Sequence, residues 1–337
     1  MGITPISDMP VISVLLSVFN NEKYIYESIR SVLCQTFENF ELIIIDDASN
    51  DHTSEILASF TDPRIRISRN LNNQGLTRSL NIGLELCKGK YIARMDSDDI
   101  SHPDRFARQV DFLEKHPSIG VLGTDYERIT SDGTHTGKVC THRSDWELVH
   151  WMLNFENPIS HQTVCLRTNF IRQVGGYNEN FRYTQDYDLW GKLARITYMA
   201  NLPETLLFYR SGHENQISIT NPNSQKEYEI KIRQRIVSQL TGQTYPLDII
   251  QILNSPPPDL DPMMKYKACL AIIKIFFSFL RVTKQLKKDK VLSIRKDSSK
   301  RITTIAKSMP EGWHKTFILF TNYILIRFIN LYAQFSM

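Results

Sequence analysis

Short apolar runs alternate with helical patterns along the first part of the chain. Residues 11–18, 40–45 and 91–95 are rich in β-branched and aliphatic side chains and lie between polar turns. This pattern predicts strands that are buried on both faces. Residues 22–34 and 76–87 instead carry apolar side chains at helical spacing. The alternation predicts an α/β fold, in which helices cover both faces of a mostly parallel sheet.

The middle of the chain continues this alternation with shorter elements. A helix is expected from near Asp186 to about Ile196, and Asp186 could itself be the N-cap of that helix. The sequence Ser131-Asp132-Gly133 predicts the turn of a hairpin. Four further strands are expected, at residues 119–123, 162–167, 197–201 and 206–209.

Three carboxylates follow one of the buried strands directly. Asp96, Asp98 and Asp99 lie within four positions, and Asp46-Asp47 ends a second strand. Ligands bind at the carboxyl ends of strands in an open α/β sheet, and crowded acids are costly unless a cation compensates them. The cluster therefore predicts a Mg²⁺ or Mn²⁺ site. The alternative is a solvated turn, in which Asp98 or Asp99 caps the next helix.

No glycine-rich phosphate loop accompanies these acids. The first strand is followed by Phe19-Asn20-Asn21 rather than by Gly-x-Gly-x-x-Gly, and no Walker sequence occurs. The phosphates of a nucleotide would then need a metal ion in place of a glycine backbone. This raises the expectation that the Asp96 cluster binds metal. A sugar-nucleotide nucleotidyltransferase would need a glycine-rich, basic loop at this place, which the chain lacks.

Charge divides the chain into an acidic body and a basic tail. The 337 residues carry a net charge of +4, but residues 265–327 alone carry +12, so the remainder carries −8. Two apolar stretches, 266–282 and 317–329, flank the basic stretch 284–301 and are themselves interrupted by Lys or Arg. We expect interfacial helices that lie on an anionic membrane surface. The alternative is a packed helical domain with a solvated basic face.

Cysteine usage and the first residues bear on the compartment. The five cysteines are dispersed without metal-ligand spacing, which indicates reduced thiols. Residues 1–10 lack the basic and apolar regions of a secretory signal. We therefore expect a cytoplasmic protein, peripheral at the inner face of the cytoplasmic membrane.

Six motifs occur in a fixed order between residues 10 and 220. They are residues 11–20, 31–37, 41–51, Asn73-Gln74-Gly75-Leu76, the Asp96-Ser97-Asp98 motif (Asp-x-Asp) and residues 185–190. Together they resemble glycosyltransferase family 2, a family of inverting enzymes with the GT-A fold, of the kind that builds bacterial surface polysaccharides. The resemblance implies a GT-A nucleotide-sugar domain at 10–220, a connecting helical region at 221–254 and the basic, apolar tail at 255–337.

The resemblance assigns donor-binding roles to residues at the strand ends. Ser17 and Phe19 would line the uridine pocket, and Asp47 would accept a hydrogen bond from the uracil ring. Arg78 would face the donor phosphates. Asp96 would face the ribose or the sugar while also contributing to the metal site. Because the position of Asp47 matches uridine readers, a UDP-sugar is the favoured donor.

The metal and the reacting hydroxyl are assigned to further residues. Asp98 is the expected direct ligand of Mn²⁺ or Mg²⁺, and Asp186 is the expected catalytic base. The family usually has Glu-Asp at the position of the base, whereas this chain has Gln185-Asp186. The contact with the acceptor that the family's Glu makes is therefore in doubt for Gln185. His213 would face the diphosphate or metal, and His161 the acceptor side. A packed or surface role is the commoner one for a single histidine.

The function implied is a metal-dependent inverting glycosyltransferase, hexosyl- or N-acetylhexosaminyl-, in surface polysaccharide synthesis. It would move a sugar from a nucleotide-sugar to a hydroxyl of a glycan or lipid-linked acceptor, with no nucleic acid as partner. Two alternatives are the nucleotidyltransferase above and a non-catalytic, membrane-bound partner of another glycosyltransferase. Such a partner would be expected to lose the motif acids, which this chain keeps.

Overall fold

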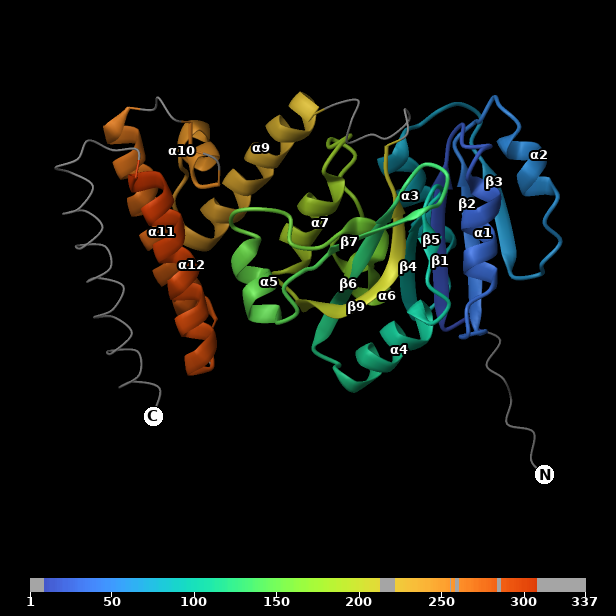
Figure 1. The fold of residues 1–337 in the computed structure, drawn as a ribbon, viewed down its shortest axis with the longest axis horizontal. Coiled ribbons are helices and arrows are strands. Elements are labelled where there is room, and N and C mark those ends of the chain that lie inside the picture. The colour runs from blue at the N-terminus through green and yellow to red at the C-terminus, as the bar shows by residue number, and fades with distance from the viewer. Residues whose placement is uncertain (1–8, 213–221, 255, 258–260, 284–285, 308–337) are drawn as a thin grey trace. The chain divides into compact units, whose positions relative to one another are not determined.

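The computed structural model describes residues 9–212, 222–254, 256–257, 261–283 and 286–307. The chain divides into two compact units, and the elements of each are labelled in Figure 1. The first unit comprises Met1–Trp146 and Pro158–Gln225. The second comprises Glu147–Asn157 and Lys226–Met337.

The first unit is built on a mixed sheet. Its strands run in the order β3-β2-β1-β4-β8-β6-β9-β5, and β7 pairs with β6. From β3 to β4 the strands are parallel, as predicted, whereas β8 is antiparallel to both of its neighbours. The strands are β1 (Ile12–Val18), β2 (Phe40–Asp46), β3 (Ile65–Arg69), β4 (Tyr91–Asp96), β5 (Ile100–Ser101), β6 (Ile119–Ile129), β7 (His135–Cys140), β8 (Cys165–Arg167) and β9 (Tyr198–Arg210).

Helices cover both faces of the parallel strands, which confirms the predicted layers. Apolar residues of α1, α2 and α4 share one core with Ile12, Val14 and Leu16 of β1. Helix α3 lies on the opposite face, where a Cβ added to Gly83 would be 2.2 Å from Leu15 Cδ1. The helices of this unit are α1 (Ile25–Leu33), α2 (Thr53–Ala58), α3 (Leu76–Leu86), α4 (Arg105–Lys115), α6 (Thr168–Gln173) and α7 (Gln185–Leu193).

Strand register decides which residues of β4 face α3. Leu15 is paired with Arg94, and Ser17 with Asp96. Neighbouring residues in a sheet point to the same face, and side chains alternate along each strand. Since Leu15 faces α3, Arg94 and Asp96 lie on that face as well. The first Asp of the Asp-x-Asp motif therefore follows a buried arginine on one side of the sheet.

Two predicted elements differ from the structure. The strand expected at 162–167 begins with a 3₁₀ turn, His161–Thr163, and only Cys165–Arg167 pairs in the sheet. The strands expected at 197–201 and 206–209 form one strand, β9. It continues through Pro203 because its register against β6 shifts between Leu202 and Thr205, where a missing N–H is tolerated.

The second unit is helical and has its own core. Phe276 and Phe279 on α11 are buried, and the ring of Trp151 lies 5.5 Å from that of Phe279. Trp151 also donates its indole N–H to Asp297 on α12, at 2.7 Å. Most apolar residues of α11 are thus buried inside this unit, whereas Leu270 and Val282 are exposed. Its helices are α5 (Trp146–Met152), which begins in the first unit, α9 (Pro222–Thr241), α10 (Leu247–Ile252), α11 (Pro262–Val282) and α12 (Lys288–Ala306).

Within the described ranges, we find no helix with the length and apolarity that a membrane crossing requires. The second apolar stretch of the tail, residues 317–329, lies outside these ranges.

Candidate functional site

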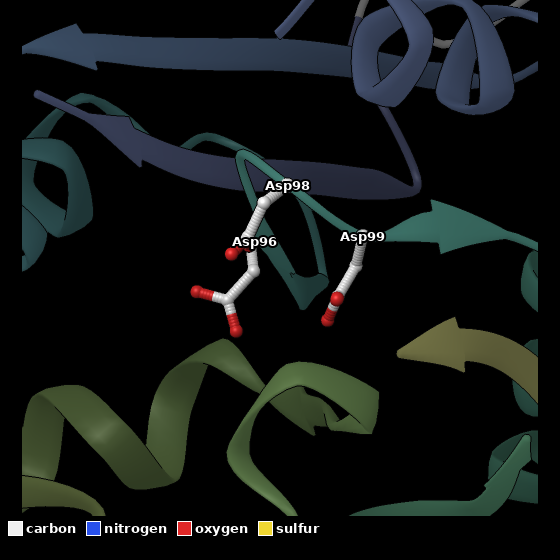
Figure 2. A group of neighbouring side chains, drawn as sticks. All are labelled: Asp96, Asp98 and Asp99. Atoms are coloured by element: carbon white, nitrogen blue, oxygen red, sulfur yellow. The ribbon is translucent and has the colours of Figure 1, made fainter. Parts of the chain in front are cut away.

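The three acids of the predicted metal site meet at the turn that follows β4. Each of Asp96, Asp98 and Asp99 has a carboxylate oxygen within 4.8 Å of the other two. Figure 2 shows Asp96 and Asp99 directed to the same side of this turn. Asp99 is fully buried, whereas Asp96 and Asp98 are half-buried. The cluster predicted from the sequence is therefore present as a geometric group.

Electrostatic repulsion within this group is severe. Burial raises the pKa of Asp99 well above its usual value, and the charges of Asp98 and Asp96 raise it further. Burial also raises the pKa of Asp96, against the effect of the Arg94 guanidinium. Asp99 Oδ2 is buried without a hydrogen-bond partner among the residues that the structure describes. These groups fit a hard divalent cation, which binds carboxylate oxygens and would relieve the repulsion.

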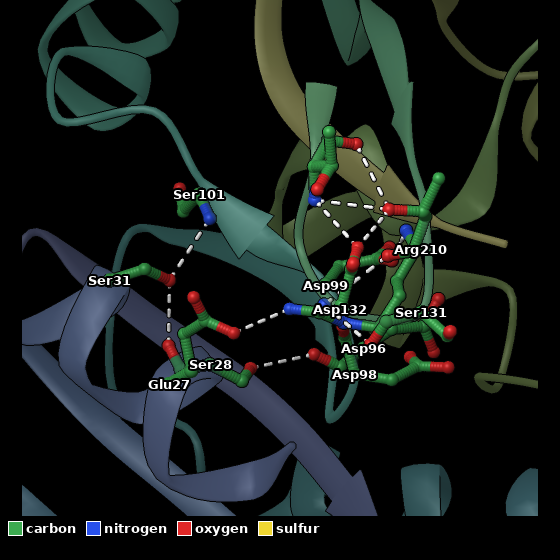
Figure 3. A network of polar contacts seen from close by, with 12 residues as sticks. Glu27, Ser28, Ser31, Asp96, Asp98, Asp99, Ser101, Ser131, Asp132 and Arg210 are labelled. Atoms are coloured by element: carbon green, nitrogen blue, oxygen red, sulfur yellow. Dashed lines mark hydrogen bonds and ion pairs between the residues drawn. The ribbon is translucent and has the colours of Figure 1, made fainter. Parts of the chain in front are cut away.

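Arg210, the last residue of β9, fixes the backbone of this turn (Figure 3). Its Nε–H donates to the carbonyl oxygen of Asp98 at 2.8 Å, and its backbone N–H donates to Asp99 Oδ1 at 2.9 Å. A further guanidinium N–H donates to Glu27 on α1 at 2.5 Å. Asp99 is thus bound to β9 and does not cap the following turn, which corrects that expectation.

Polar residues of α1 and of the segment just after it hold the same turn from the other side. The Ser28 hydroxyl donates to the carbonyl oxygen of Asp96 at 2.9 Å, and the Ser101 N–H donates to Ser31 Oγ at 2.9 Å. The Gln35 amide donates to the carbonyl oxygen of His102 at 2.7 Å. The motif at residues 31–37 therefore anchors the turn that carries the acids.

The turns after β1, β2 and β4 are joined by side-chain hydrogen bonds. The Asn21 amide donates to Ser97 Oγ at 2.7 Å, which connects the first of these turns to the third. The backbone N–H of Asn20 donates to Ser49 Oγ at 3.0 Å, which connects the first to the second. The carboxyl edge of the parallel strands is thus one connected structure.

Asp47 holds the loop that leads into α3. It is only 2% exposed, and its Oδ1 accepts from the Asn70 amide at 2.7 Å and the Gln74 N–H at 2.8 Å. Its Oδ2 accepts from the N–H of Gly75 at 2.8 Å, where φ is +83°. The hydrogen bonds to Asp47 thus give the motif Asn73-Gln74-Gly75-Leu76 a structural role in forming this loop. A contact between Asp47 and a uracil ring stays a prediction.

Asp186 lies in the first turn of α7 and shares a neighbour with Asp96. The N-cap of α7 is Thr184, with φ at 57°, so the alternative that Asp186 is the N-cap is wrong. The charges of Asp186 and Asp96 both raise the pKa of Tyr177, although burial is the largest cause of that shift. The predicted base and the first acid of the Asp-x-Asp motif therefore lie within electrostatic reach of one side chain.

His161 is a buried, neutral residue beside the same tyrosine. Its Nε2 is hydrogen-bonded to the Tyr177 hydroxyl at 2.8 Å, and its ring meets Trp190 of α7 edge to face. Burial and the charge of Arg94 hold the pKa of His161 well below its usual value. His161 thus packs against α7. This arrangement does not test its predicted role on the acceptor side.

The remaining predicted site residues are spread around the acids. Ser17 is half-buried on β1, and Phe19 is 46% exposed just beyond it. Arg78 on α3 lies 3.7 Å from Glu179. Gln185 is buried as the first residue of α7. His213 lies outside the described residues.

Sequence reasoning missed the buried arginines Arg94, Arg105 and Arg210. Arg94 carried a usable signal, because a charged side chain inside an apolar strand is rarely buried without a partner. Arg105, on α4, donates to the carbonyl oxygen of Arg94 at 2.8 Å. The pattern of apolar residues in this helix did not indicate that Arg105 is buried. Arg210 gave no local signal, since Glu27 lies 183 positions away in the sequence.

The chain is similar to several known proteins. A profile described as Glycosyl transferase family 2 matches residues 13–163. A protein of Haemophilus influenzae named an uncharacterized glycosyltransferase is 36% identical over 239 residues, covering 68% of this chain and 74% of the relative. The amylovoran biosynthesis glycosyltransferase AmsE of Erwinia amylovora is 29% identical over 209 residues, covering 60% of this chain and 77% of AmsE.

Among solved structures, S. aureus TarS 1-349 in complex with UDP-GlcNAc is similar along nearly the whole chain. The TM-score is 0.58 at 18% sequence identity, over 96% of this chain and 91% of TarS 1-349. At this identity the likeness shows a shared fold.

Replacing Arg210 tests the anchoring of the acidic turn. We expect Arg210→Met to lower the free energy of unfolding by about 1–3 kcal/mol, because it leaves the carbonyl oxygen of Asp98 and the carboxylate of Glu27 without their guanidinium donor. Urea unfolding would measure this. Arg108→Met is the control, since its ion pair with Glu204 is largely exposed and should contribute about 1 kcal/mol or less. Equal losses in the two variants would contradict the anchoring role.

Proposed function

The chain belongs to glycosyl transferase family 2, and we propose that it moves a sugar from a UDP-sugar to a hydroxyl of a glycan or lipid-linked acceptor in polysaccharide synthesis. It is a glycosyltransferase with the GT-A fold. The observation that carries the proposal is the meeting of Asp96, Asp98 and Asp99 at the carboxyl edge of the parallel strands. The UDP-GlcNAc held by TarS supports the donor class, and the amylovoran pathway of AmsE supports the acceptor class.

We propose that Asp98 is the first ligand of a Mg²⁺ or Mn²⁺ ion, with Asp96 beside it. The crowding of the acids and the unsatisfied oxygen of Asp99 support such an ion. When bound, a divalent cation stabilises the negative charge on the leaving diphosphate. His213 stays a predicted further ligand. Ser17, Phe19, Asp47 and Arg78 stay predicted donor contacts around the same strand ends.

Asp186 is the proposed general base of an inverting transfer. The acceptor oxygen forms a bond to the anomeric carbon from the face opposite the diphosphate, and its proton passes to the Asp186 carboxylate. The bond between the anomeric carbon and the phosphate oxygen breaks, and the electron pair leaves with the nucleoside diphosphate. The half-buried position of Asp186, on the helix that packs on His161, supports this role. Gln185 and His161 are the proposed acceptor-side residues.

The helical unit is proposed to rest on an anionic membrane surface at the inner face of the cytoplasmic membrane. Because most apolar residues of α11 are buried, Leu270 and Val282 being exposed, the contact would be mainly electrostatic and not an insertion of this helix. Lys296, Lys300 and Lys307 are exposed at helical spacing along α12 and just beyond its end. They form one basic edge that suits phosphate headgroups.

Substituting the proposed base tests the mechanism. We expect Asp186→Asn to lower the transfer rate by about 10²–10⁴-fold, because the acceptor proton loses its carboxylate. UDP binding should remain unchanged in calorimetric titration, since Asp186 is assigned to the acceptor. Asp111→Asn, an exposed acid paired with Lys115, is the control and should be as active as the wild type. Near-normal turnover in Asp186→Asn would refute the role.

Metal dependence is tested on binding rather than on turnover. In the wild type, Mn²⁺ should strengthen UDP binding, because the cation joins the carboxylates to the diphosphate. In Asp98→Asn this gain should fall by about tenfold or more, equivalent to at least 1.4 kcal/mol. Calorimetry of UDP with Mn²⁺ or with EDTA measures it. A gain from Mn²⁺ that is the same in both proteins would count against Asp98 as the ligand.

The membrane contact is tested with full-length charge variants. A triple variant with Gln at Lys296, Lys300 and Lys307 should lose about 3 kcal/mol of binding to phosphatidylglycerol vesicles, at about 1 kcal/mol per lysine. Co-sedimentation with vesicles of different phosphatidylglycerol content would measure it. The matched control replaces Lys23, Lys115 and Lys138, three exposed lysines of the first unit. If both triple variants bind alike, α12 is not the contact.

A further inference from the structure

We propose that Arg94 is a positioning residue of the donor site. Its buried guanidinium holds the carboxylate of Asp96 and balances its charge, so that a divalent cation binds first to Asp98. This inference rests on the proposed function, because it assumes that the cluster binds a cation. It goes further by naming the residue that separates the tasks proposed for the two acids of the motif.

The geometry places Arg94 directly behind Asp96. The two residues lie two positions apart on β4, so their side chains share the face of the sheet that packs on α3. The side chain of Arg94 is 3% exposed and forms an ion pair with Asp96 Oδ1. An arginine so deeply buried is costly unless an acid compensates it. One carboxylate oxygen of Asp96 is therefore paired with Arg94, which balances part of the negative charge that Asp96 brings to the cluster.

The other groups around Arg94 give it little competing negative charge. The Arg105 guanidinium donates to the backbone carbonyl of Arg94 and brings a second buried positive charge. On the side of α7, the charge of Arg94 acts on His161 and Tyr177. Burial disfavours the charged form of both side chains, so neither adds a negative charge beside Arg94. Asp99, within the cluster itself, is the other acid that senses Arg94.

This charge distribution separates the roles of the two motif acids. A carboxylate that is paired with a guanidinium remains a good acceptor for hydroxyl groups but is a weaker ligand for a dication. Asp96 is then suited to accept hydrogen bonds from the ribose or sugar of the donor. Asp98 is then the acid to which a Mn²⁺ ion binds first.

The test measures Mn²⁺ binding to the full-length protein without nucleotide, by electron paramagnetic resonance of the free ion. We expect Arg94→Met to bind Mn²⁺ at least about tenfold more tightly than the wild type, because one nearby unit charge is removed. Arg94→Lys should bind as the wild type does, because it keeps the charge. In activity assays, Arg94→Met should raise the KM for the UDP-sugar more than it lowers kcat.

A matched control separates positioning from simple damage to the sheet. Arg167 on β8 lies opposite Tyr91, at the far end of β4 from Asp96, and it donates to the Tyr91 hydroxyl and to three backbone carbonyls. Arg167→Met should lower stability without changing Mn²⁺ affinity. If Arg94→Met does not fold, Arg94→Gln removes the charge while keeping a donor toward Asp96, with the same expected gain.

The outcomes distinguish this inference from the proposed function. A wild-type protein that does not bind Mn²⁺ would overturn the proposed metal site, and the role of Arg94 with it. A wild type that binds Mn²⁺, together with a folded neutral variant of unchanged or weaker affinity, would overturn the role of Arg94 alone. Tighter binding in the neutral variant and wild-type binding in Arg94→Lys would support it.

Discussion

Balancing buried charge is the constraint on which this carboxylate turn depends. Three acids within one turn repel each other, and water cannot screen the fully buried Asp99. Arg94 and Arg210 compensate from within the protein, one at the carboxylate of Asp96 and one at the backbone of the turn. Arg94 is itself tolerated in the interior because Asp96 pairs with it, and Arg210 because Glu27 does. The acids and the guanidinium groups thus require each other.

The same turn explains why distant segments of the chain carry polar residues in otherwise apolar contexts. Helix α1 packs its apolar side on the sheet and turns Ser28 and Ser31 toward the loop after β4, and Gln35, just beyond the helix, bonds to the same loop. Strand β9 ends in Arg210 at the same place. A substitution in any of these elements would reach the acids through backbone hydrogen bonds, without touching a carboxylate. The site is therefore a property of the whole carboxyl edge.

The sequence predicted the parts of this fold that follow from local periodicity. The parallel strands, the helices α1 and α3, and the acidic cluster all arise from patterns a few residues long. The missed features depend on pairing between distant residues. The two strands expected at 197–201 and 206–209 are one strand, because the register shift against β6 accommodates Pro203 between them. The loop residues that bind the carboxylate of Asp47 lie 23 to 28 positions away along the chain, so the sequence did not indicate this structural role beside the predicted donor contact.

The short segment Glu147–Asn157 belongs to the helical unit although it is synthesised between strands of the first. Trp151 and its acceptor Asp297 are separated by 146 positions, so no nascent chain can form this bond until α12 has left the ribosome. Before α11 has also been synthesised, the ring of Trp151 lacks the rings of Phe276 and Phe279 that pack on it. The first unit thus carries an apolar segment through most of translation, when exposed apolar surface favours aggregation. The C-terminal helices therefore cover a segment that is synthesised much earlier, and they are an integral part of the folded structure.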